Sequence, residues 1–536
     1  MQANAQPAAP PRQASPLGTR KGGTGEPVLR LTGISKRFGS LLANDGISLT
    51  LQAGEVLALL GENGAGKSTL MSILFGHYVA DAGDIEVFGQ ALPPGQPKAA
   101  LAAGIGMVHQ HFALADNMSV LDNVMLGTEP WWQPVSRRAA ARQKLLGVAT
   151  RFGLPVAPDA LVAGLSVGER QRVEILKALY RGARILILDE PTAVLTPQES
   201  EALFDTLAQM VAQGLSIIFI SHKLGEVLRV AHRVAVLRHG KLVAEAVNDQ
   251  AGAITQSQLA QWMVGHAIEA PARRPAQTVG APVCVLERAS TAAGAQDRLN
   301  GVSLQLHAGE IVAIAGVSGN GQVALAEVLC GTRALSAGTG TFLGAPLLPR
   351  PALLVRQGLA RIPEDRHGVG VVGDLPVWEN AVSERLRGPH FSRGGVVKHR
   401  AAMAHAARIE QQFDVRGGGL ASKASALSGG NMQKLILGRA LLSPDATPPR
   451  LIVAHQPTWG LDIGAVTYVQ QQLIAARDAG AAVLLISDDL DEVLALGDRV
   501  AVMHGGHLGD ARPALDWSRE AIGLAMAGVN PNEMAA

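Results

Sequence analysis

Near the start of the chain the sequence reads Gly61-Glu62-Asn63-Gly64-Ala65-Gly66-Lys67-Ser68-Thr69. This segment fits the pattern G-x-x-x-x-G-K-[ST]. An apolar run at residues 56–60 precedes it, and residues 70–75 have helical character. The order of strand, glycine-rich loop and helix is the context in which this pattern binds phosphate. We therefore predict a phosphate-binding loop at residues 61–69.

The residue types explain how such a loop holds an anion. Gly61, Gly64 and Gly66 allow backbone N–H groups to curl around a phosphate without side-chain clashes. The helix that follows directs the positive end of its dipole at the same anion. Lys67 is placed to reach the terminal phosphates, and the Ser68 hydroxyl is placed to bind magnesium. The alternative is a glycine-rich turn with a solvated lysine, and the flanking strand and helix argue against it.

The composition limits the class of protein. A chain of 536 residues is expected to form two or more domains, and its apolar share of 47% supplies their cores. Only 17% of the residues are charged and the net charge is +2, so nucleic acid is not an expected partner. The two cysteines, Cys284 and Cys330, fit neither a disulfide framework nor a metal site, which indicates a reduced compartment.

The N-terminal residues are rich in Ala, Pro, Gln and Gly. They lack the apolar core of a signal peptide, so we expect a disordered leader over residues 1–27. No stretch of the chain holds the roughly 18 uninterrupted apolar residues of a membrane-spanning helix. We therefore expect a soluble chain that is still able to sit on a membrane protein.

From about Val28 onward, short runs of Val, Ile and Leu alternate with helical segments, which predicts an α/β fold with a mostly parallel sheet. Residues 184–189 stay apolar until their end, as expected of a strand buried on both faces. Residues 111–164 carry little strand signal. We predict a helical insertion there.

The sequence then repeats itself. Residues 299–322 restate residues 44–67, and LDEPT at residues 188–192 recurs as AHQPT at residues 454–458. Repetition over this length indicates a duplicated domain. The predicted order is a first domain over residues 28–265, a linker over residues 266–282 and a second domain over residues 283–530.

Further polar residues follow predicted strands. Gln110 comes after a short apolar run, and residues 165–171 (LSVGERQ) open a helix. Asp189 and Glu190 end one buried strand, and His222 ends another. The carboxyl ends of parallel strands are where open α/β sheets bind ligands. Asp189 is then placed to hold magnesium, and Glu190 to orient or activate an attacking water.

Together these motifs resemble the ATP-binding cassette (ABC) family over residues 28–528. The resemblance implies two tandem P-loop NTPase domains that bind ATP and Mg²⁺. It implies the following roles in the first half: adenine stacking for Phe38, nucleotide binding for residues 61–69 (Walker A), magnesium binding for Ser68, Gln110 (Q-loop) and Asp189 (Walker B), and catalysis for Glu190, His222 and Gln110.

The family's signature loop has a counterpart in each half, at residues 165–169 (LSVGE) and 427–431 (LSGGN). In this family two cassettes pair head to tail, so that the signature of one meets the nucleotide of the other. The resemblance therefore implies that the second half completes the first ATP site through Ser428, Gly429, Gly430 and Asp462.

The second half departs from the family pattern at each catalytic position. A charged hydrogen bond contributes about 1.5–3 kcal/mol, so loss of the lysine alone weakens nucleotide binding without preventing it. Loss of the metal ligands, the base and the switch residue together predicts that this site does not hydrolyse ATP. The sequence does not decide whether this second site still binds nucleotide. The replacements are Gln322 and Val323 in the loop, Glu364, the pair His455-Gln456, and Asp488.

In the family that this chain resembles, tandem cassettes without a membrane domain occur in two groups. One group is the importers of sugars and nucleosides, and the other is the soluble translation or repair factors. The chain lacks the charged helical linker, zinc cysteines and coiled coils of the soluble factors. Residues 104–127, 192–199, 316–322 and 363–372 look most like nucleoside importers, with ribose-type importers as near neighbours. The resemblance implies a peripheral subunit on the cytoplasmic face of the inner membrane, bound to two permeases and served by a substrate-binding lipoprotein or periplasmic protein.

Overall fold

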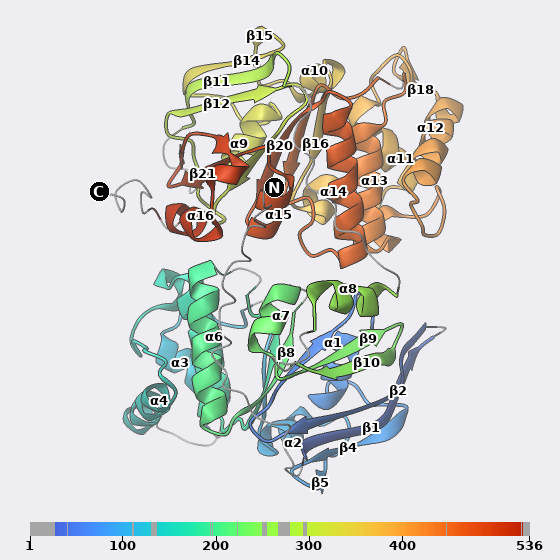
Figure 1. Cartoon of the computed structure of the whole chain (residues 1–536). Coiled ribbons are helices and arrows are strands. Elements are labelled where there is room, and N and C mark those ends of the chain that lie inside the picture. Colours follow the sequence, from blue (N-terminus) through green and yellow to red (C-terminus); the bar gives the residue numbers. More distant parts are fainter. Residues whose placement is uncertain are drawn as a thin grey trace, which may run out of the picture. The chain divides into compact units, whose positions relative to one another are not determined.

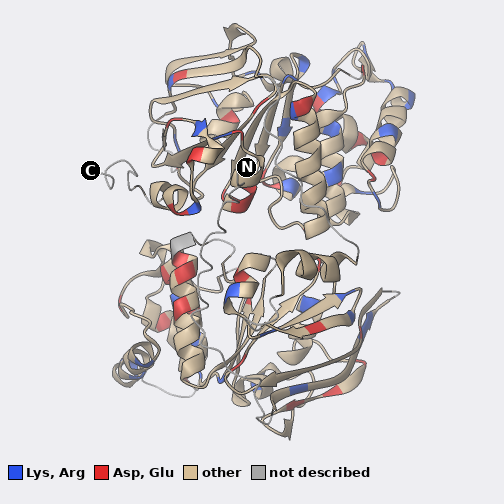
Figure 2. Ribbon diagram, viewed as in Figure 1, with Lys and Arg blue, Asp and Glu red and all other residues tan. Residues whose placement is uncertain are grey.

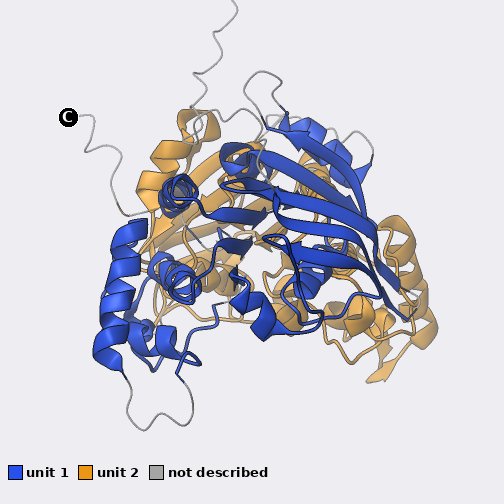
Figure 3. Ribbon diagram, turned by 90° about the horizontal axis from the view of Figure 1, so that it is seen from below, with its two compact units in different colours: residues 1–268 blue, residues 269–536 orange. Residues whose placement is uncertain are grey.

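The computed structural model describes residues 27–39, 41–109, 112–129, 137–192, 195, 197–221, 223–248, 254–265, 279–292, 297–445, 447–526 and 528. The chain divides into two compact units, residues 1–268 (unit 1) and residues 269–536 (unit 2), coloured separately in Figure 3. No helix among the described residues has the length and apolar character needed to cross a membrane.

Unit 1 contains a six-stranded sheet in the order β10-β9-β3-β8-β7-β6 (Figure 1). All neighbouring pairs are parallel except β10 with β9. Every residue of β3 is fully buried, as expected of a strand covered on both faces. The bounds are β3 Val56–Leu60, β6 Ile105–Val108, β7 Ile185–Asp189, β8 Ser216–Ile220, β9 Arg233–Arg238 and β10 Lys241–Val247.

A second, antiparallel sheet of unit 1 has the order β2-β1-β4-β5. Apolar residues of both sheets and of α1 share one core, which includes Leu31, Leu59 and Leu70. The bounds are β1 Pro27–Phe38, β2 Leu41–Gln52, β4 Ala82–Val87 and β5 Gln90–Ala91.

The helices of unit 1 lie between and beside these strands, and α3, α4 and α6 lie on the side away from the antiparallel sheet (Figure 1). Their bounds are α1 Lys67–Leu74, α2 Pro97–Ala102, α3 Val120–Met125, α4 Arg138–Phe152, α5 Val167–Tyr180, α6 Pro197–Ala212, α7 Leu224–Val230 and α8 Gln256–Val264.

Unit 2 repeats this plan. A sheet in the order β16-β19-β20-β13-β21-β22, with β23 on β21, is parallel from β16 through β21. An antiparallel sheet has the order β12-β11-β14-β15. The bounds are β11 Pro282–Ser290, β12 Val302–His307, β13 Ile311–Ala315, β14 Ala337–Phe342, β15 Ala345–Pro346, β16 Leu359–Ile362, β19 Leu451–His455, β20 Ala482–Ser487, β21 Arg499–His504, β22 His507–Leu508 and β23 Arg512–Pro513.

The helices of unit 2 include a cluster, α11, α12 and α13, that packs on itself beside the hairpin β17–β18 (Ser392–Arg393 and Val396–Val397). The bounds are α9 Gln322–Leu329, α10 Pro351–Arg356, the π-helical turn η2 Arg366–Gly370, α11 Val377–Val382, η3 Ser383–Arg385, α12 His399–Gln412, α13 Gly429–Leu441, α14 Ile463–Asp478, α15 Leu490–Leu496 and α16 Arg519–Met526.

The main sequence predictions of local structure hold, with small shifts at their ends. The strand predicted at residues 56–60 is β3, and residues 185–189 of the predicted buried strand form β7. The helix predicted at residues 70–75 begins earlier, at Lys67, because Gly66 before it adopts a left-handed conformation and caps it. Within the predicted helical insertion the described residues form α3, α4 and the short turn Val162–Gly164.

Two predicted segments fall mostly outside the described residues. Residues 1–26 of the predicted leader do so, and β1 begins at Pro27. Residues 266–278 of the predicted linker do so as well, and β11 begins at Pro282. Lys and Arg occur together with Asp and Glu along the ribbon of each unit (Figure 2).

Candidate functional site

The first glycine loop joins β3 to α1 in unit 1. Gly61 and Gly66 have φ angles of 152° and 102°. A Cβ atom at Gly61 would lie 2.4 Å from the Leu237 carbonyl oxygen, and one at Gly66 would lie 2.3 Å from the Ala43 carbonyl oxygen. Both positions therefore require glycine for space as well as for conformation.

Lys67 is the first residue of α1, and its ammonium group bends back over the loop. Nζ donates hydrogen bonds to the carbonyl oxygens of Gly61, at 2.6 Å, and Glu62, at 3.1 Å. Asn44, which is fully buried, donates from Nδ2 to the Gly66 carbonyl oxygen at 3.1 Å. The positive charge is thus held inside the curve of the loop, where an anion would enter.

The remaining loop residues have different exposures. Ala65 is buried, whereas Asn63, Gly64 and Ser68 are exposed. Ser68 and Thr69 lie in the first turn of α1, where backbone N–H groups have no partner within the helix. Ser68 and the first-turn N–H groups are the groups to which the sequence pattern assigns magnesium and phosphate binding.

Two carboxylates follow β7 at the same edge of the sheet. Burial raises the pKa of the Asp189 carboxyl, and the negative charge of Glu190 raises it further. The positive charge of Lys67 acts in the opposite direction, as does His109. The charges of Lys67 and Glu190 are thus both near enough to Asp189 to shift its pKa.

Glu190 has an unusual backbone. Its φ angle is 48°, and its N–H donates to the Ile220 carbonyl oxygen at 2.9 Å. A non-glycine residue in the left-handed region carries strain of about 1–3 kcal/mol, and such residues concentrate at functional sites. The turn carries the chain away from β7 directly after the acidic pair.

A carboxylate that the sequence analysis did not single out connects this turn to β8. Glu226, in α7, accepts hydrogen bonds from Thr192 Oγ1 at 2.5 Å and from Ser221 Oγ at 3.3 Å. Lys223 Nζ lies 3.6 Å from Glu226 Oε1. Glu226 therefore holds the segment after β7 against the segment after β8, and only the fold brings these residues together.

Two predicted residues, Gln110 and His222, lie outside the described residues. Their neighbours are described. His109 lies close enough to affect Asp189, and Ser221 and Lys223 both contact Glu226. Both strands that lead to the predicted residues, β6 and β8, end at the edge of the sheet that carries Asp189.

The predicted stacking residue, Phe38, is the last residue of β1 and is 41% exposed. Its ring meets Tyr78 edge to face, with the ring centroids 5.4 Å apart. Lys36 Nζ lies 5.5 Å from the centroid of the Phe38 ring. An exposed aromatic held in this way offers a face to a planar base.

The second glycine loop, between β13 and α9, is filled by its own side chain. Gln322 is only 4% exposed. Its Nε2 donates to the Val317 carbonyl oxygen at 2.7 Å, and its Oε1 accepts from the Asn320 N–H at 2.9 Å. One N–H group of this loop is therefore taken by the residue that replaces lysine.

A carboxylate takes a further N–H group at the start of α9. Asp297 Oδ2 accepts a hydrogen bond from the Ala324 N–H at 2.7 Å. Alignment of the repeats puts Ala324 where the first half has Thr69, and Asp297 where it has Leu42. A negative charge in unit 2 thus occupies a donor that a phosphate-binding loop offers to its ligand.

The end of β19 carries the residues that replace the acidic pair. His455 is 8% exposed, and burial lowers its pKa to about 4, so the imidazole is neutral at pH 7. Burial raises the pKa of Glu364, and the charges of Asp488 and Asp297 raise it further. The neutral imidazole of His455 is a poor ligand for Mg²⁺, which prefers hard oxygen ligands.

The two signature loops cap the helices that follow them. Ser428 is the N-cap of α13, and its Oγ accepts from the Asn431 N–H at 3.4 Å. Ser166 is the N-cap of α5, where Glu169 completes a reciprocal capping box. Gly429 and Gly430 form the first turn of α13, and Asp462 caps α14 through the Ala465 N–H at 2.8 Å.

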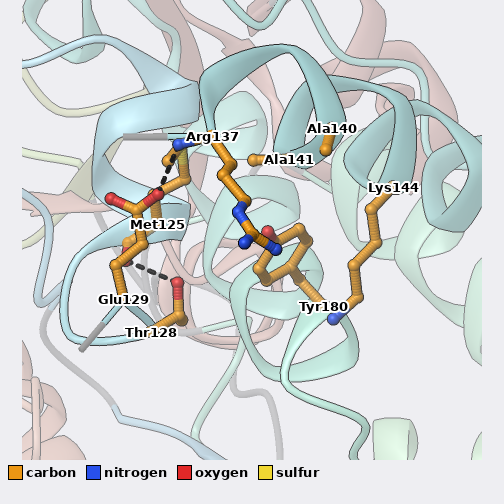
Figure 4. A pocket seen from close by; sticks show the side chains of 8 residues that line it. All are labelled: Met125, Thr128, Glu129, Arg137, Ala140, Ala141, Lys144 and Tyr180. Atoms are coloured by element: carbon orange, nitrogen blue, oxygen red, sulfur yellow. Dashed lines mark hydrogen bonds between the residues drawn. The ribbon is translucent and has the colours of Figure 1, made fainter. Parts of the chain in front are cut away.

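A separate cavity of about 280 Å³ lies among α3, α4 and α5 of unit 1 (Figure 4). Lys144 Nζ lies 4.2 Å from the centroid of the Tyr180 ring, and Glu129 Oε1 accepts from the Arg137 N–H at 2.8 Å. None of the predicted site residues is among its lining residues, which are Met125, Thr128, Glu129, Arg137, Ala140, Ala141, Lys144 and Tyr180.

Comparison with known proteins follows the duplicated pattern. The family described as ABC transporter matches twice, at residues 44–193 and 299–454. The nucleoside import ATP-binding protein NupA of Lactococcus lactis is 41% identical over 513 residues, covering 95% of this chain and 99% of that protein. The guanosine import ATP-binding protein NupO of Bacillus subtilis is 42% identical over 512 residues, with the same coverage of 95% and 99%.

A relative that is named for a different cargo is equally similar. The glucose import ATP-binding protein TsgD13 of Haloferax volcanii is 42% identical over 540 residues, covering 94% of this chain and 96% of that protein. Overall identity therefore does not separate the two cargo classes.

Proposed function

We propose a site assignment, a cargo and partners for this chain, which belongs to the ABC transporter family and is an ATPase that energises an importer. The observation that supports the site assignment is the contrast between the two loops. Unit 1 gathers Lys67, Asp189 and Glu190 at one sheet edge, whereas unit 2 has Gln322, His455 and Gln456 at the matching positions. One loop of the two is equipped for hydrolysis.

In the proposed site, unit 1 holds the nucleotide. Lys67 and the N–H groups of the loop bind the terminal phosphates, and the exposed face of Phe38 meets the base. Ser68, Asp189 and Gln110 offer oxygen ligands that suit Mg²⁺. When bound, Mg²⁺ neutralises charge that develops on the phosphoryl oxygens.

Hydrolysis in this site depends on three residues. Glu190 orients and deprotonates the attacking water, and Gln110 and His222 align the water and the γ-phosphate. Glu226 keeps the two segments that carry Glu190 and His222 in register through Thr192 and Ser221. The serine and glycines of the second signature, Ser428–Gly430, with Asp462, complete the site from unit 2.

The mechanism is a switch driven by ATP. Nucleotide bound between the two cassettes holds them closed, and hydrolysis lets them open. We propose that two membrane permease subunits follow this motion at the cytoplasmic face of the membrane. A substrate-binding lipoprotein or periplasmic protein delivers the cargo to them.

The proposed cargo is a nucleoside. Two of the three relatives above carry names that state nucleoside or guanosine import, and the four stretches noted in the sequence resemble that group. A simple sugar is the second candidate, since the glucose import relative is equally identical.

Uptake by a strain that lacks this chain tests the cargo. High-affinity uptake of labelled nucleoside should disappear, and the Glu190→Gln chain should fail to restore it. Loss of ribose or glucose uptake with unchanged nucleoside uptake would reject the nucleoside and keep the importer. Normal uptake of all three, with the chain bound to ribosomes, would support the soluble class instead.

A further inference from the structure

The second glycine loop is closed by amide side chains of unit 2. A Cβ atom at Gly316 would lie 2.5 Å from Gln322 Nε2, so the Gln322 side chain fills the space directly over the start of the loop. Asn320 Nδ2 donates to the Val317 carbonyl oxygen at 2.8 Å, and Asn320 Oδ1 accepts from the Gly505 N–H at 2.8 Å. The loop is therefore tied to itself and to the turn after β21 without any bound anion.

A carboxylate occupies the other end of the loop, at the start of α9. One oxygen of Asp297, Oδ2, accepts the Ala324 N–H, and the other, Oδ1, is buried and has no hydrogen-bond partner among the described residues. The Asp297 carbonyl oxygen accepts from Arg333 Nη1 at 2.8 Å, and Arg333 is paired with Glu327 at 2.6 Å. Contacts within unit 2 thus hold an anion at a helix N-terminus, where a phosphate-binding loop holds its ligand.

Asp297 also lies near the residues that replace the catalytic set. Burial raises the pKa of the Glu364 carboxyl, and the charges of Asp488 and Asp297 add to this effect. Burial lowers the pKa of His455 to about 4, and the charge of Asp297 acts in the opposite direction. His455 Nε2 lies 3.6 Å from Glu364 Oε2. Asp297 is therefore near enough to both residues to act on them.

The charges of this region differ from those of unit 1. Asp297, Glu364 and Asp488 stand where unit 1 has Leu42, Gln110 and His222, and Gln322 stands where unit 1 has Lys67. A nucleotide at the second loop would therefore bring its phosphates to three carboxylates, with an amide in place of the lysine. Like charges at close range repel, and this repulsion is strong where water is excluded.

We propose that Asp297 is a built-in ligand of the second loop, that it takes the place of a nucleotide phosphate, and that the chain therefore binds one ATP and not two. Gln322 fills the space that a lysine ammonium would need, and Asp297 occupies the donor that a phosphate would need. Unit 2 thus keeps its loop formed without a nucleotide. This rests on the proposed function only in that the one ATP is held by Lys67.

The number of nucleotides bound by the full chain is the first test. Equilibrium dialysis with a labelled non-hydrolysable ATP analogue and Mg²⁺ should give one nucleotide per chain. Lys67→Ala should weaken this binding by about tenfold or more and leave no site of the original affinity. Two nucleotides per wild-type chain, or an unweakened site in Lys67→Ala, would overturn the proposal. If Glu190→Gln then still abolishes hydrolysis, the proposed site in unit 1 stands, whereas hydrolysis at the wild-type rate rejects that site as well.

Opening the second loop is the second test. In a Lys67→Ala background, Asp297→Leu combined with Gln322→Lys gives unit 2 the residues that unit 1 has at these positions. The combined change should add a nucleotide site at least about tenfold tighter than any in its parent. Asp510→Leu is the matched control, because it removes an exposed negative charge of unit 2 outside the loop and should add no site. Failure of the combined change to add a site would contradict the role of the two side chains.

Inorganic phosphate separates a built-in ligand from a simple helix cap. In the Lys67→Ala background, Asp297→Leu should lower the unfolding temperature of the nucleotide-free chain, because α9 loses its acceptor at Ala324. Added phosphate should raise the unfolding temperature of this variant toward that of its parent and leave the parent unchanged, with potassium chloride of equal ionic strength as the control. A decrease that phosphate does not repair would mean that Asp297 only caps the helix, and the proposal would be wrong.

Discussion

Glu190 and Gln456 occupy matching turns with the same backbone. Both have a φ angle of 48°, and both donate their N–H to the carbonyl oxygen of an isoleucine, Ile220 or Ile486. One turn carries a carboxylate and the other an amide. The two turns therefore share their backbone conformation but differ in the chemistry of their side chains. Both units thus have the strained turn, and unit 1 has a carboxylic acid at it.

The first prediction concerns this acid. Glu190→Gln should lower the ATPase rate by about 10²–10⁴ because an amide cannot accept the proton of the attacking water. Nucleotide affinity should stay within about tenfold of the wild type, since Lys67 and the loop are unchanged. Adding Gln456→Glu to that variant should not restore the rate, because His455 and Val323 still stand at the positions where magnesium ligands are needed. Recovery of activity would show that the second loop is closer to competence than its residues indicate.

The second prediction concerns Asp297, whose carboxylate accepts a hydrogen bond from the Ala324 N–H. Asp297→Leu gives unit 2 the residue that unit 1 has at Leu42, and should strengthen nucleotide binding at the second loop by about tenfold or more. The converse change, Leu42→Asp, should weaken binding at the first loop, and Leu42→Asn should weaken it less. Equilibrium binding in a Lys67→Ala background isolates the second loop. Equal affinity of Asp297→Leu and its parent would contradict the role of the carboxylate.

At the level of elements, an ion cluster joins three parts of unit 2. Glu384 Oε1, in η3, accepts from Arg361 Nε of β16 at 2.7 Å and lies 3.4 Å from Arg439 Nη2 of α13. Burial alone would raise the pKa of Glu384, but Arg439 and Arg361 outweigh it and hold the pKa below its usual value. The carboxylate therefore stays ionised between the buried Arg439 and the partly buried Arg361.

The third prediction follows from this cluster. Glu384→Gln leaves two cations without their partner and should cost about 3–5 kcal/mol of the free energy of unfolding at pH 7. A lowered pKa in the folded state means that the contribution is complete above the usual value of 4.5 and is lost as the pH falls below it. Urea unfolding should therefore show a difference between wild type and variant that shrinks below about pH 4.5.

An exposed ion pair provides the control. Lys423 and Asp374 are paired at 2.9 Å with side chains 65% and 89% exposed. Asp374→Asn should change the free energy of unfolding by less than about 1 kcal/mol. A comparable loss in both variants would mean that the method reports general destabilisation.

The sequence was sufficient for the repeated plan of elements, because strand, glycine loop and helix are local patterns. It also located β3, β7 and the acidic pair that follows β7. It did not reveal Glu226 or Asp297, because their partners are distant in sequence and meet only through the fold. Nothing in the sequence near Asp297 indicates that its carboxylate accepts a hydrogen bond from the Ala324 N–H.

For the whole molecule, the account predicts association with a membrane through partners. No helix in the described ranges is long and apolar enough to span a bilayer. The chain expressed alone should remain in the supernatant after ultracentrifugation, and with its permeases it should co-purify in detergent. Stable binding to ribosomes or DNA in place of membranes would contradict the importer function.

The central claim is that one ATP site of the two turns over and that both halves build it. Ser428 belongs to the regular signature of unit 2, and Ser166 belongs to the signature of unit 1, which contains Val167 and Glu169. Groups that stabilise transition-state charge contribute about 2.7–4 kcal/mol each in other enzymes.

The most direct measurement is the ATPase rate of the assembled transporter with Ser428→Arg or Ser166→Arg. We predict that Ser428→Arg lowers the rate nearly as far as Glu190→Gln, although residues 428 and 190 lie in different halves of the chain. In the proposed head-to-tail pairing the first signature serves the second loop, so Ser166→Arg should retain substantial hydrolysis. Equal losses from Ser166→Arg and Ser428→Arg would contradict the claim, because both sites would then be required.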